Sequence, residues 1–160
     1  MSASGATTTV LAWRLELGSG CSVAVGGREL LHLIERPRLR PAPEQPPYAR
    51  WRLHWRDMVV PVVDLPALLA GTAACGAPAL IGVFAYRAAD GLAHSAGGLS
   101  LEALPARLRV GDEQACALPS RLANWAPLTL SCFEHAGEVL PVVDLVAMFS
   151  RLLLPAQAAG

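Results

Sequence analysis

Three observations predict an all-β protein built from two small, related units. The segment Pro61-Val62-Val63-Asp64-Leu65 recurs at residues 141–145, half a chain length later. About nine or ten short apolar or alternating segments have the pattern of strands. The sequence also holds 13 prolines and 14 glycines, which favour frequent turns and short helices. Many short strands are typical of small barrels or a sandwich, and the repeat favours two barrels.

Each copy of the repeat predicts a buried strand that passes into a short helix. A β-branched apolar run ends in an aspartate, which is followed by a second apolar run. Asp64 and Asp144 are therefore expected to cap helices rather than to act as paired acid/base carboxylates. The turn Arg56-Asp57 corresponds to Ala136-Gly137 in the second copy. We therefore expect the repeat to include a whole hairpin followed by a helix.

In the first half of the chain, alternating patterns predict a hairpin over residues 10–17 and 22–25, with Gly18-Ser19-Gly20 as its turn. Residues 28–35 fit either one or two helical turns or a bulged strand. Five prolines predict an extended loop over residues 36–50. Residues 51–55 alternate between aromatic or aliphatic side chains and basic ones, which predicts a strand with a buried aromatic face.

The second half continues with strands separated by small-residue turns. After the first repeat we expect a helix near 65–70, strands at 79–86 and 92–101 joined at 89–91, and a strand at 104–110. Residues 111–127 are expected to form a loop with a helical turn near 121–125. A hairpin over 128–133 and 139–143 and a helix over 145–154 complete the chain.

Length and composition predict one domain over residues 1–160, with approximate lobes 10–75 and 76–154. Whether the lobes exchange their ends is left open, and residues 1–9 and 155–160 are expected to be flexible tails. Residues 65–86 carry no charge, but their prolines and glycines argue against a membrane span. The first nine residues have no signal-peptide pattern, so we expect a cytoplasmic protein without membrane insertion.

The side chains that commonly carry chemistry form no recognisable site. The cysteines show no metal-ligand spacing and are expected to be reduced thiols: Cys21, Cys75, Cys116 and Cys132. The histidines likewise share no metal spacing: His32, His54, His94 and His135. Gly18-Ser19-Gly20 joins two strands, so no helix N-terminus is available there for a phosphate. We therefore expect no enzymatic activity, metal or cofactor.

Residues 36–56 are the one marked charge feature, with six of the 13 arginines and only Glu44 opposing them. A solvated strand face and loop would explain the pattern without any partner. Arginine also binds carboxylates through its planar guanidinium, which favours an acidic protein partner. A nucleic-acid-binding barrel is the alternative function. Because the net charge is zero, nucleic acid is not the expected partner.

Residues 51–65 resemble the signature of CheW-like domains, in which a tight turn precedes a strand that ends in Pro-Val-x-Asp-Leu. Residues 98–102 and 140–145 resemble two further family segments in the expected order, so that the resemblance covers about residues 10–154. It implies a fold of two packed five-stranded SH3-like barrels. It also implies a non-enzymatic adaptor that couples methyl-accepting chemoreceptors to a CheA-type histidine kinase.

The family's turn arginine maps to Arg56, which the resemblance places in a region of protein contact. The complete expected interface comprises Arg38, Arg52, His54, Trp55, Arg56 and Asp57. The sequence departs from the family pattern at His54, where asparagine is usual, at Asp57, where glycine is usual, and at Glu102, where aspartate is usual. These departures indicate a divergent member, such as an accessory adaptor in a chemosensory system that governs type IV pili.

Overall fold

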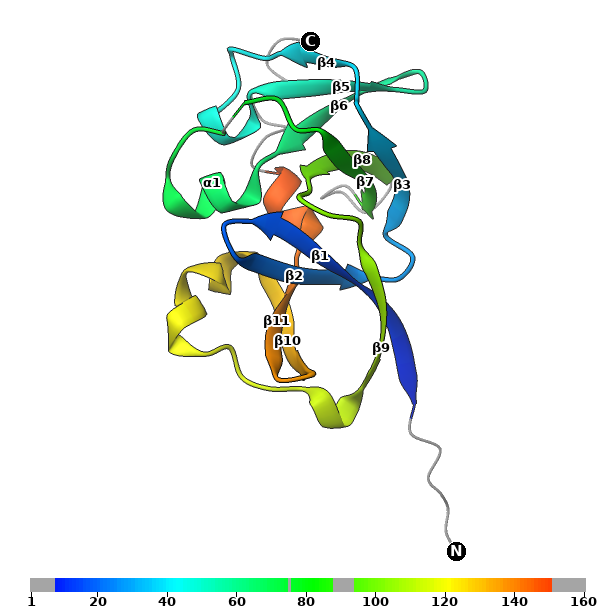
Figure 1. The fold of residues 1–160 in the computed structure, drawn as a ribbon, viewed down its shortest axis with the longest axis vertical. Helices are drawn as coiled ribbons and strands as arrows, with labels where there is room; N and C mark the ends of the chain where they lie inside the picture. The colour runs from blue at the N-terminus through cyan, green and yellow to red at the C-terminus, as the bar shows by residue number, and fades with distance from the viewer. Residues whose placement is uncertain (1–7, 75, 88–93, 151–160) are drawn as a thin grey trace, which may run out of the picture.

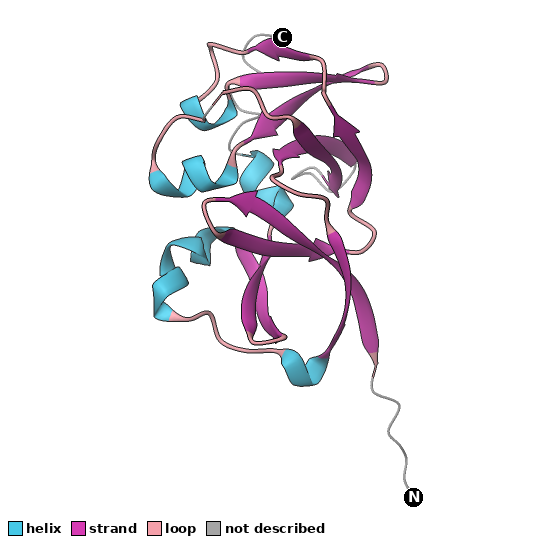
Figure 2. Cartoon of the chain, in the orientation of Figure 1, coloured by secondary structure: helices cyan, strands magenta, loops and turns pink. Residues whose placement is uncertain are grey.

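The computed structural model describes residues 8–74, 76–87 and 94–150, which form two curled β-sheets with short helices (Figures 1 and 2). The five-stranded sheet has the order β10-β11-β2-β1-β9, from β1 (Thr9–Gly18), β2 (Cys21–Gly26), β9 (Ala106–Gly111), β10 (Thr129–His135) and β11 (Glu138–Val143). The six-stranded sheet has the order β3-β7-β8-β6-β5-β4, from β3 (Leu30–Glu35), β4 (Leu39–Pro41), β5 (Trp51–Trp55), β6 (Met58–Val63), β7 (Leu80–Arg87) and β8 (His94–Ser100).

The helices of the described residues are short, and all but the last lie between strands. They are η1 (Pro47–Ala49), α1 (Leu65–Ala70), η2 (Asp112–Gln114), η3 (Ser120–Leu128) and the helical residues 145–150. The all-β, two-subdomain fold class is therefore confirmed. The expected five strands in each subdomain hold for one sheet, while the other gains β4. This three-residue strand lies within the proline-rich segment 36–50, where proline density masks a strand signal.

Both copies of the repeat have the same local structure. The N–H of Ala67 donates to the Asp64 Oδ1 (3.1 Å), and the N–H of Ala147 donates to the Asp144 Oδ1 (3.0 Å). The backbone N–H of each aspartate donates at 2.8 Å to a carbonyl from the preceding 3-10 helix, that of Tyr48 or of Leu128. Both aspartates are thus helix N-caps, as their sequence context predicts.

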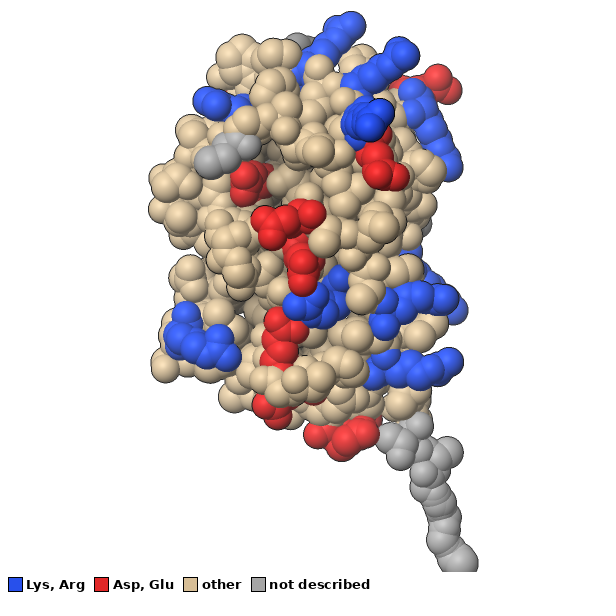
Figure 3. Space-filling view, viewed as in Figure 1, with Lys and Arg blue, Asp and Glu red and all other residues tan. Residues whose placement is uncertain are grey.

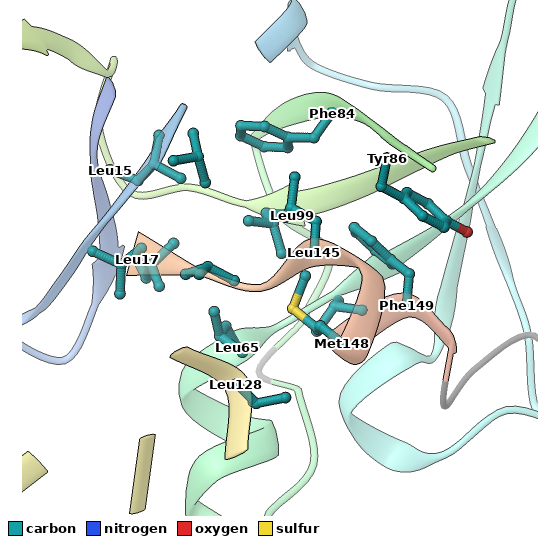
Figure 4. Packing of buried hydrophobic residues seen from close by; sticks show 14 of the residues in the cluster. Leu15, Leu17, Leu65, Phe84, Tyr86, Leu99, Leu128, Leu145, Met148 and Phe149 are labelled. Atoms are coloured by element: carbon teal, nitrogen blue, oxygen red, sulfur yellow. The ribbon is translucent and has the colours of Figure 1, made fainter. Parts of the chain in front are cut away.

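One hydrophobic core joins the two sheets (Figure 4). Leu15 and Leu17 from β1 belong to the same buried cluster as Phe84 and Leu99 from the six-stranded sheet. Helical residues 145–150 follow a strand of the five-stranded sheet, yet the ring of Phe149 stacks on Tyr86 of β7, with centroids 5.0 Å apart. The second repeat therefore contributes its strand to one sheet and part of its helix to the core beneath the other.

Each sheet takes strands from both sides of residue 75, so each draws on both of the expected lobes. The alternative left open at residues 28–35 is a bulged strand, because the β3–β7 register shifts between Leu30 and His32. The expected loop over 111–127 contains η2 and all but the last residue of η3, and the helical turn expected near 121–125 lies within η3. The turn expected at 89–91 lies outside the described residues.

Candidate protein interface

The outer face of β4, β5 and β6 brings together basic and apolar side chains. Arg40 pairs with Arg52, and Arg52 pairs with Pro61, across three adjacent strands. His54 pairs with Val59, whose side chain is 54% exposed. Alternation along β5 sends Leu53 to the opposite, buried face. This arrangement matches the expected strand with an aromatic and aliphatic inner face and a basic outer face.

Arg38 joins this outer face from the residue before β4. Its carbonyl accepts a hydrogen bond from the N–H of His54 at 3.5 Å. Because side chains alternate along extended backbone, Arg38 lies on the same side as Arg40, and both are exposed. The structure therefore brings Arg38, Arg52 and His54 together, although Arg38 is far from the other two in sequence.

The tip of the β5–β6 hairpin carries Arg56 above a buried ring. The guanidinium carbon of Arg56 lies 4.5 Å from the centroid of the Trp55 ring. Trp55 is only 8% exposed, so it offers little surface of its own and instead supports Arg56 from below. Asp57 and Met58 are both exposed beside it. The tip thus presents a cation, a carboxylate and an apolar side chain.

Part of the basic charge is neutralised within the chain. Arg52 forms an ion pair with Glu44, the one acidic residue of the arginine-rich segment 36–56. Figure 3 shows basic side chains at the top of the six-stranded half, near β4 and β5, and others on the five-stranded half. The candidate interface is therefore a locally basic surface on a chain whose net charge is zero.

The corresponding hairpin of the second repeat, β10–β11, has a different surface. Glutamates replace His54 and Met58, at Glu134 and Glu138. Glu138 accepts a hydrogen bond from Nε of Arg14 at 2.7 Å, and this contact holds the pKa of Glu138 below its usual value. The second hairpin therefore uses its carboxylate to join β11 to β1, whereas the first leaves its charged tip exposed.

A groove of about 550 Å³ lies between the two sheets. The β1–β2 turn lines one side, while α1 and Tyr48 of η1 line another. Asp64 and Glu102 contribute the carboxylates of its lining, and Figure 3 shows acidic side chains near the middle of this face. Sequence reasoning missed this groove, because its lining comes from segments that are widely separated in the chain.

Neither a metal-binding cluster nor a membrane-spanning helix occurs among the described residues. No three histidine, cysteine, aspartate or glutamate side chains among them are close enough to hold a metal ion together. None of the helices within the described segments has the length and apolar character needed to cross a bilayer.

No protein-family model and no curated protein matches the sequence of this chain. Solved structures do match its fold. One is the scaffolding protein TtCheW from Thermoanaerobacter tengcongensis, which superimposes with a TM-score of 0.71 at 13% sequence identity. The match covers 89% of this chain and 93% of that chain. The chain therefore has a CheW-like fold, as the motif over residues 51–65 predicts.

Proposed function

We propose that this protein is a cytoplasmic, non-enzymatic adaptor that couples a methyl-accepting chemoreceptor to a CheA-type histidine kinase. The observation that carries the proposal is the exposed basic and apolar face of β4–β6 on a CheW-like fold. The similar solved structure is described as a scaffolding protein, in keeping with a role in binding. Asp64 and Asp144 are both occupied as helix caps, and this structural use of the only repeated carboxylates is in keeping with a non-enzymatic role.

The kinase is the partner that we assign to the β5–β6 hairpin and its neighbour β4. Arg38 and Arg56 offer cations, Val59 and Met58 offer exposed apolar surface, and Asp57 adds an acceptor. Mixed apolar and arginine-rich surfaces are typical of protein interfaces. The kinase surface that binds here is therefore expected to carry carboxylates around an apolar centre.

A coupling protein needs a second surface for its second partner. The groove between the sheets is separate from the outer face of β4–β6 and combines apolar lining residues with Asp64 and Glu102. We assign the receptor to this groove, since concave sites between subdomains are common positions for ligands and peptides. The two partners could then bind at the same time.

The direct test mixes the full chain with the regulatory domain of the cognate kinase and a cytoplasmic receptor fragment, and isolates complexes by size-exclusion chromatography. The proposal predicts binary complexes with each partner and a ternary complex of all three. Absence of kinase binding by protein that circular dichroism shows to be folded would contradict it. A salt-dependent shift of DNA or RNA in a gel, without kinase binding, would instead favour the nucleic-acid alternative.

The departures at His54 and Asp57 motivate a narrower proposal, that the output of the system is motility driven by type IV pili. Deletion of the gene is then expected to reduce twitching motility and to leave flagellar swimming unchanged. Loss of swimming with normal twitching would overturn the assignment to pili while leaving the adaptor role in place.

A further inference from the structure

Two cysteines that the sequence gives no reason to associate lie face to face in the structure. The Sγ atoms of Cys116 and Cys132 are 3.6 Å apart, and the N–H of Cys116 donates to the carbonyl of Cys132 at 3.0 Å. Their neighbours Ala115 and Phe133 form an antiparallel β-bridge. The two cysteines are therefore directly opposite each other on neighbouring extended segments.

The segment that carries Cys116 is held against β10 by further contacts. The N–H of Gly111 donates to Oε1 of Gln114 at 2.9 Å, and Nε2 of Gln114 donates to the carbonyl of Glu134 at 3.1 Å. The first bond shapes the segment itself, and the second, together with the backbone bond between Cys116 and Cys132, holds it beside β10 before any covalent link forms. Little chain entropy remains to be lost when the two sulfur atoms approach to the bonding distance of about 2 Å.

This position is where the five-stranded sheet closes on itself. β9 and β10 are the two ends of its strand order, and the bridge at Ala115 connects the segment after β9 to β10. The six-stranded sheet closes in an equivalent way. β4 follows β3, which lies at one end of the strand order, and β4 pairs with β5 at the other end, where Arg40 lies opposite Arg52. Cys132 occupies in the second repeat the position that Arg52 occupies in the first.

We propose that Cys116 and Cys132 form a reversible disulfide that locks the closure of the five-stranded sheet under oxidising conditions. The pairing geometry and the fixed segment carry this inference, which does not depend on the adaptor role. In the reduced state the closure rests on a single bridge and a few hydrogen bonds. In the oxidised state a covalent link would tether residues 112–116 to β10.

The order of the chemical steps follows from exposure. Cys116 is partly exposed, whereas Cys132 is only 6% exposed. Burial is the main cause that raises the pKa of Cys132 to about 11, and the hydrogen bond with Cys116 is the second. The thiolate of Cys116 therefore attacks a peroxide first. The O–O bond of hydrogen peroxide breaks, one oxygen leaves as water after protonation, and Cys116 becomes a sulfenic acid.

The second step closes the disulfide. Sγ of Cys132 loses its proton and attacks Sγ of Cys116, so that an S–S bond forms, the S–O bond breaks and the hydroxyl leaves as water. The two sulfur atoms together lose two electrons, which reduce the peroxide. A dithiol reductant reverses the reaction by thiol–disulfide exchange. Because Cys132 is protonated at neutral pH, this step is expected to be slow and to quicken as the pH rises.

The test treats the full chain with hydrogen peroxide and maps its thiols by differential alkylation and mass spectrometry. The proposal predicts a peptide pair linked through Cys116 and Cys132, loss of two hydrogen atoms from the monomer, and full reversal by dithiothreitol. It also predicts that the oxidised protein melts several degrees higher, since the link constrains the unfolded chain. Recovery of both cysteines as free thiols, or linkage to another cysteine or another chain, would overturn it.

Variants separate this pair from the remaining thiols. Cys116→Ser is expected to abolish both the linked peptide and the rise in melting temperature, and Cys132→Ala serves as a second variant with an apolar replacement. Cys21→Ser is the matched control and should keep both effects. If the disulfide forms but the melting temperature does not rise, the locking role is wrong. If oxidation raises the melting temperature of Cys116→Ser as much as that of the unaltered protein, the assignment of the site is wrong.

Discussion

The guanidinium of Arg56 lies over the ring of Trp55, 4.5 Å from its centroid, and Trp55 is itself anchored in the buried cluster of the six-stranded sheet. The exposed charge at the hairpin tip is therefore positioned by a core residue. Arg56 also has a φ of 55°, in the left-handed region, and Ala136 has a φ of 52° at the equivalent turn. The two turns share a left-handed first residue, but they differ at the second, where Gly137 has a φ of 79° and Asp57 does not have a positive φ.

The left-handed backbone at Ala136 predicts that glycine would be more stable there. A Cβ at positive φ costs about 1–2 kcal/mol, of which the greater freedom of unfolded glycine cancels part. Ala136→Gly is expected to raise the free energy of unfolding by about 0.5–1 kcal/mol, measured by urea denaturation. Ala136→Val is the control and should lower it, because a β-branched side chain tolerates positive φ poorly.

Gly97 of β8 is predicted to be intolerant of any side chain. A Cβ added at Gly97 would overlap the ring of Phe149, which is buried and stacked on Tyr86. Gly97→Ala is expected to cost about 2 kcal/mol through overpacking. In the double variant with Phe149→Leu the two losses should be less than additive, because the smaller side chain relieves the contact. Full additivity would show that residue 149 does not pack beneath β8.

The two capping aspartates predict a matched pair of stability losses. Asp64→Ala and Asp144→Ala should each lower the free energy of unfolding by about 1 kcal/mol, since each leaves a helix N–H without its side-chain acceptor. Asp57→Ala, at the exposed turn, is the control and should change stability by less than about 0.5 kcal/mol. Losses near zero in both cap variants would contradict the structural role of the repeat.

The contact between Arg14 and Glu138 predicts a specific pH dependence. Because Arg14 lowers the pKa of Glu138 in the folded state, this pair stabilises the protein above the unfolded pKa of the carboxyl group. That contribution is lost as the pH falls through the lowered folded value. Glu138→Gln should therefore have a lower urea midpoint than the unaltered protein at pH 7. The difference should shrink below pH 4.5, the usual value for the group; a constant difference would exclude the ionic contribution.

Local patterns in the sequence account for most of the fold. The β5–β6 and β10–β11 hairpins follow from period-two alternation, and the caps at Asp64 and Asp144 follow from a strand-to-helix transition, both short-range effects. The three-residue strand β4 could not be predicted, because its evidence is its pairing with β5 rather than its own composition. Which strands belong to which sheet also depends on pairing between distant segments, and so could not be predicted from local patterns.

In the candidate interface, too, the features within one strand could be predicted from the sequence, whereas those that depend on long-range packing could not. The outward direction of the half-buried Arg52 and the exposed His54 follows from alternation within one strand, and so does the burial of Trp55. The placement of Arg38 beside them depends on β4, and the groove between the sheets depends on the packing of distant segments. The Cys116–Cys132 pair likewise results from closure of the sheet, for which the spacing of the two residues gives no local signal.

Binding of a CheA-type kinase by the hairpin at Arg56 is the proposed interaction on which the adaptor role depends. Titration calorimetry of the kinase regulatory domain with Arg56→Glu and with Arg109→Glu tests it most directly. Both changes reverse one exposed arginine, but Arg109 lies on β9 of the other sheet. Arg56→Glu is expected to weaken binding at least about tenfold, a loss of about 1.4 kcal/mol. Its melting temperature should change little, because an exposed charge contributes little stability.

Arg109→Glu should bind the kinase domain as tightly as the unaltered protein. Equal affinities for all three proteins, or a loss confined to Arg109→Glu, would contradict the assignment of the first hairpin as the kinase-binding surface.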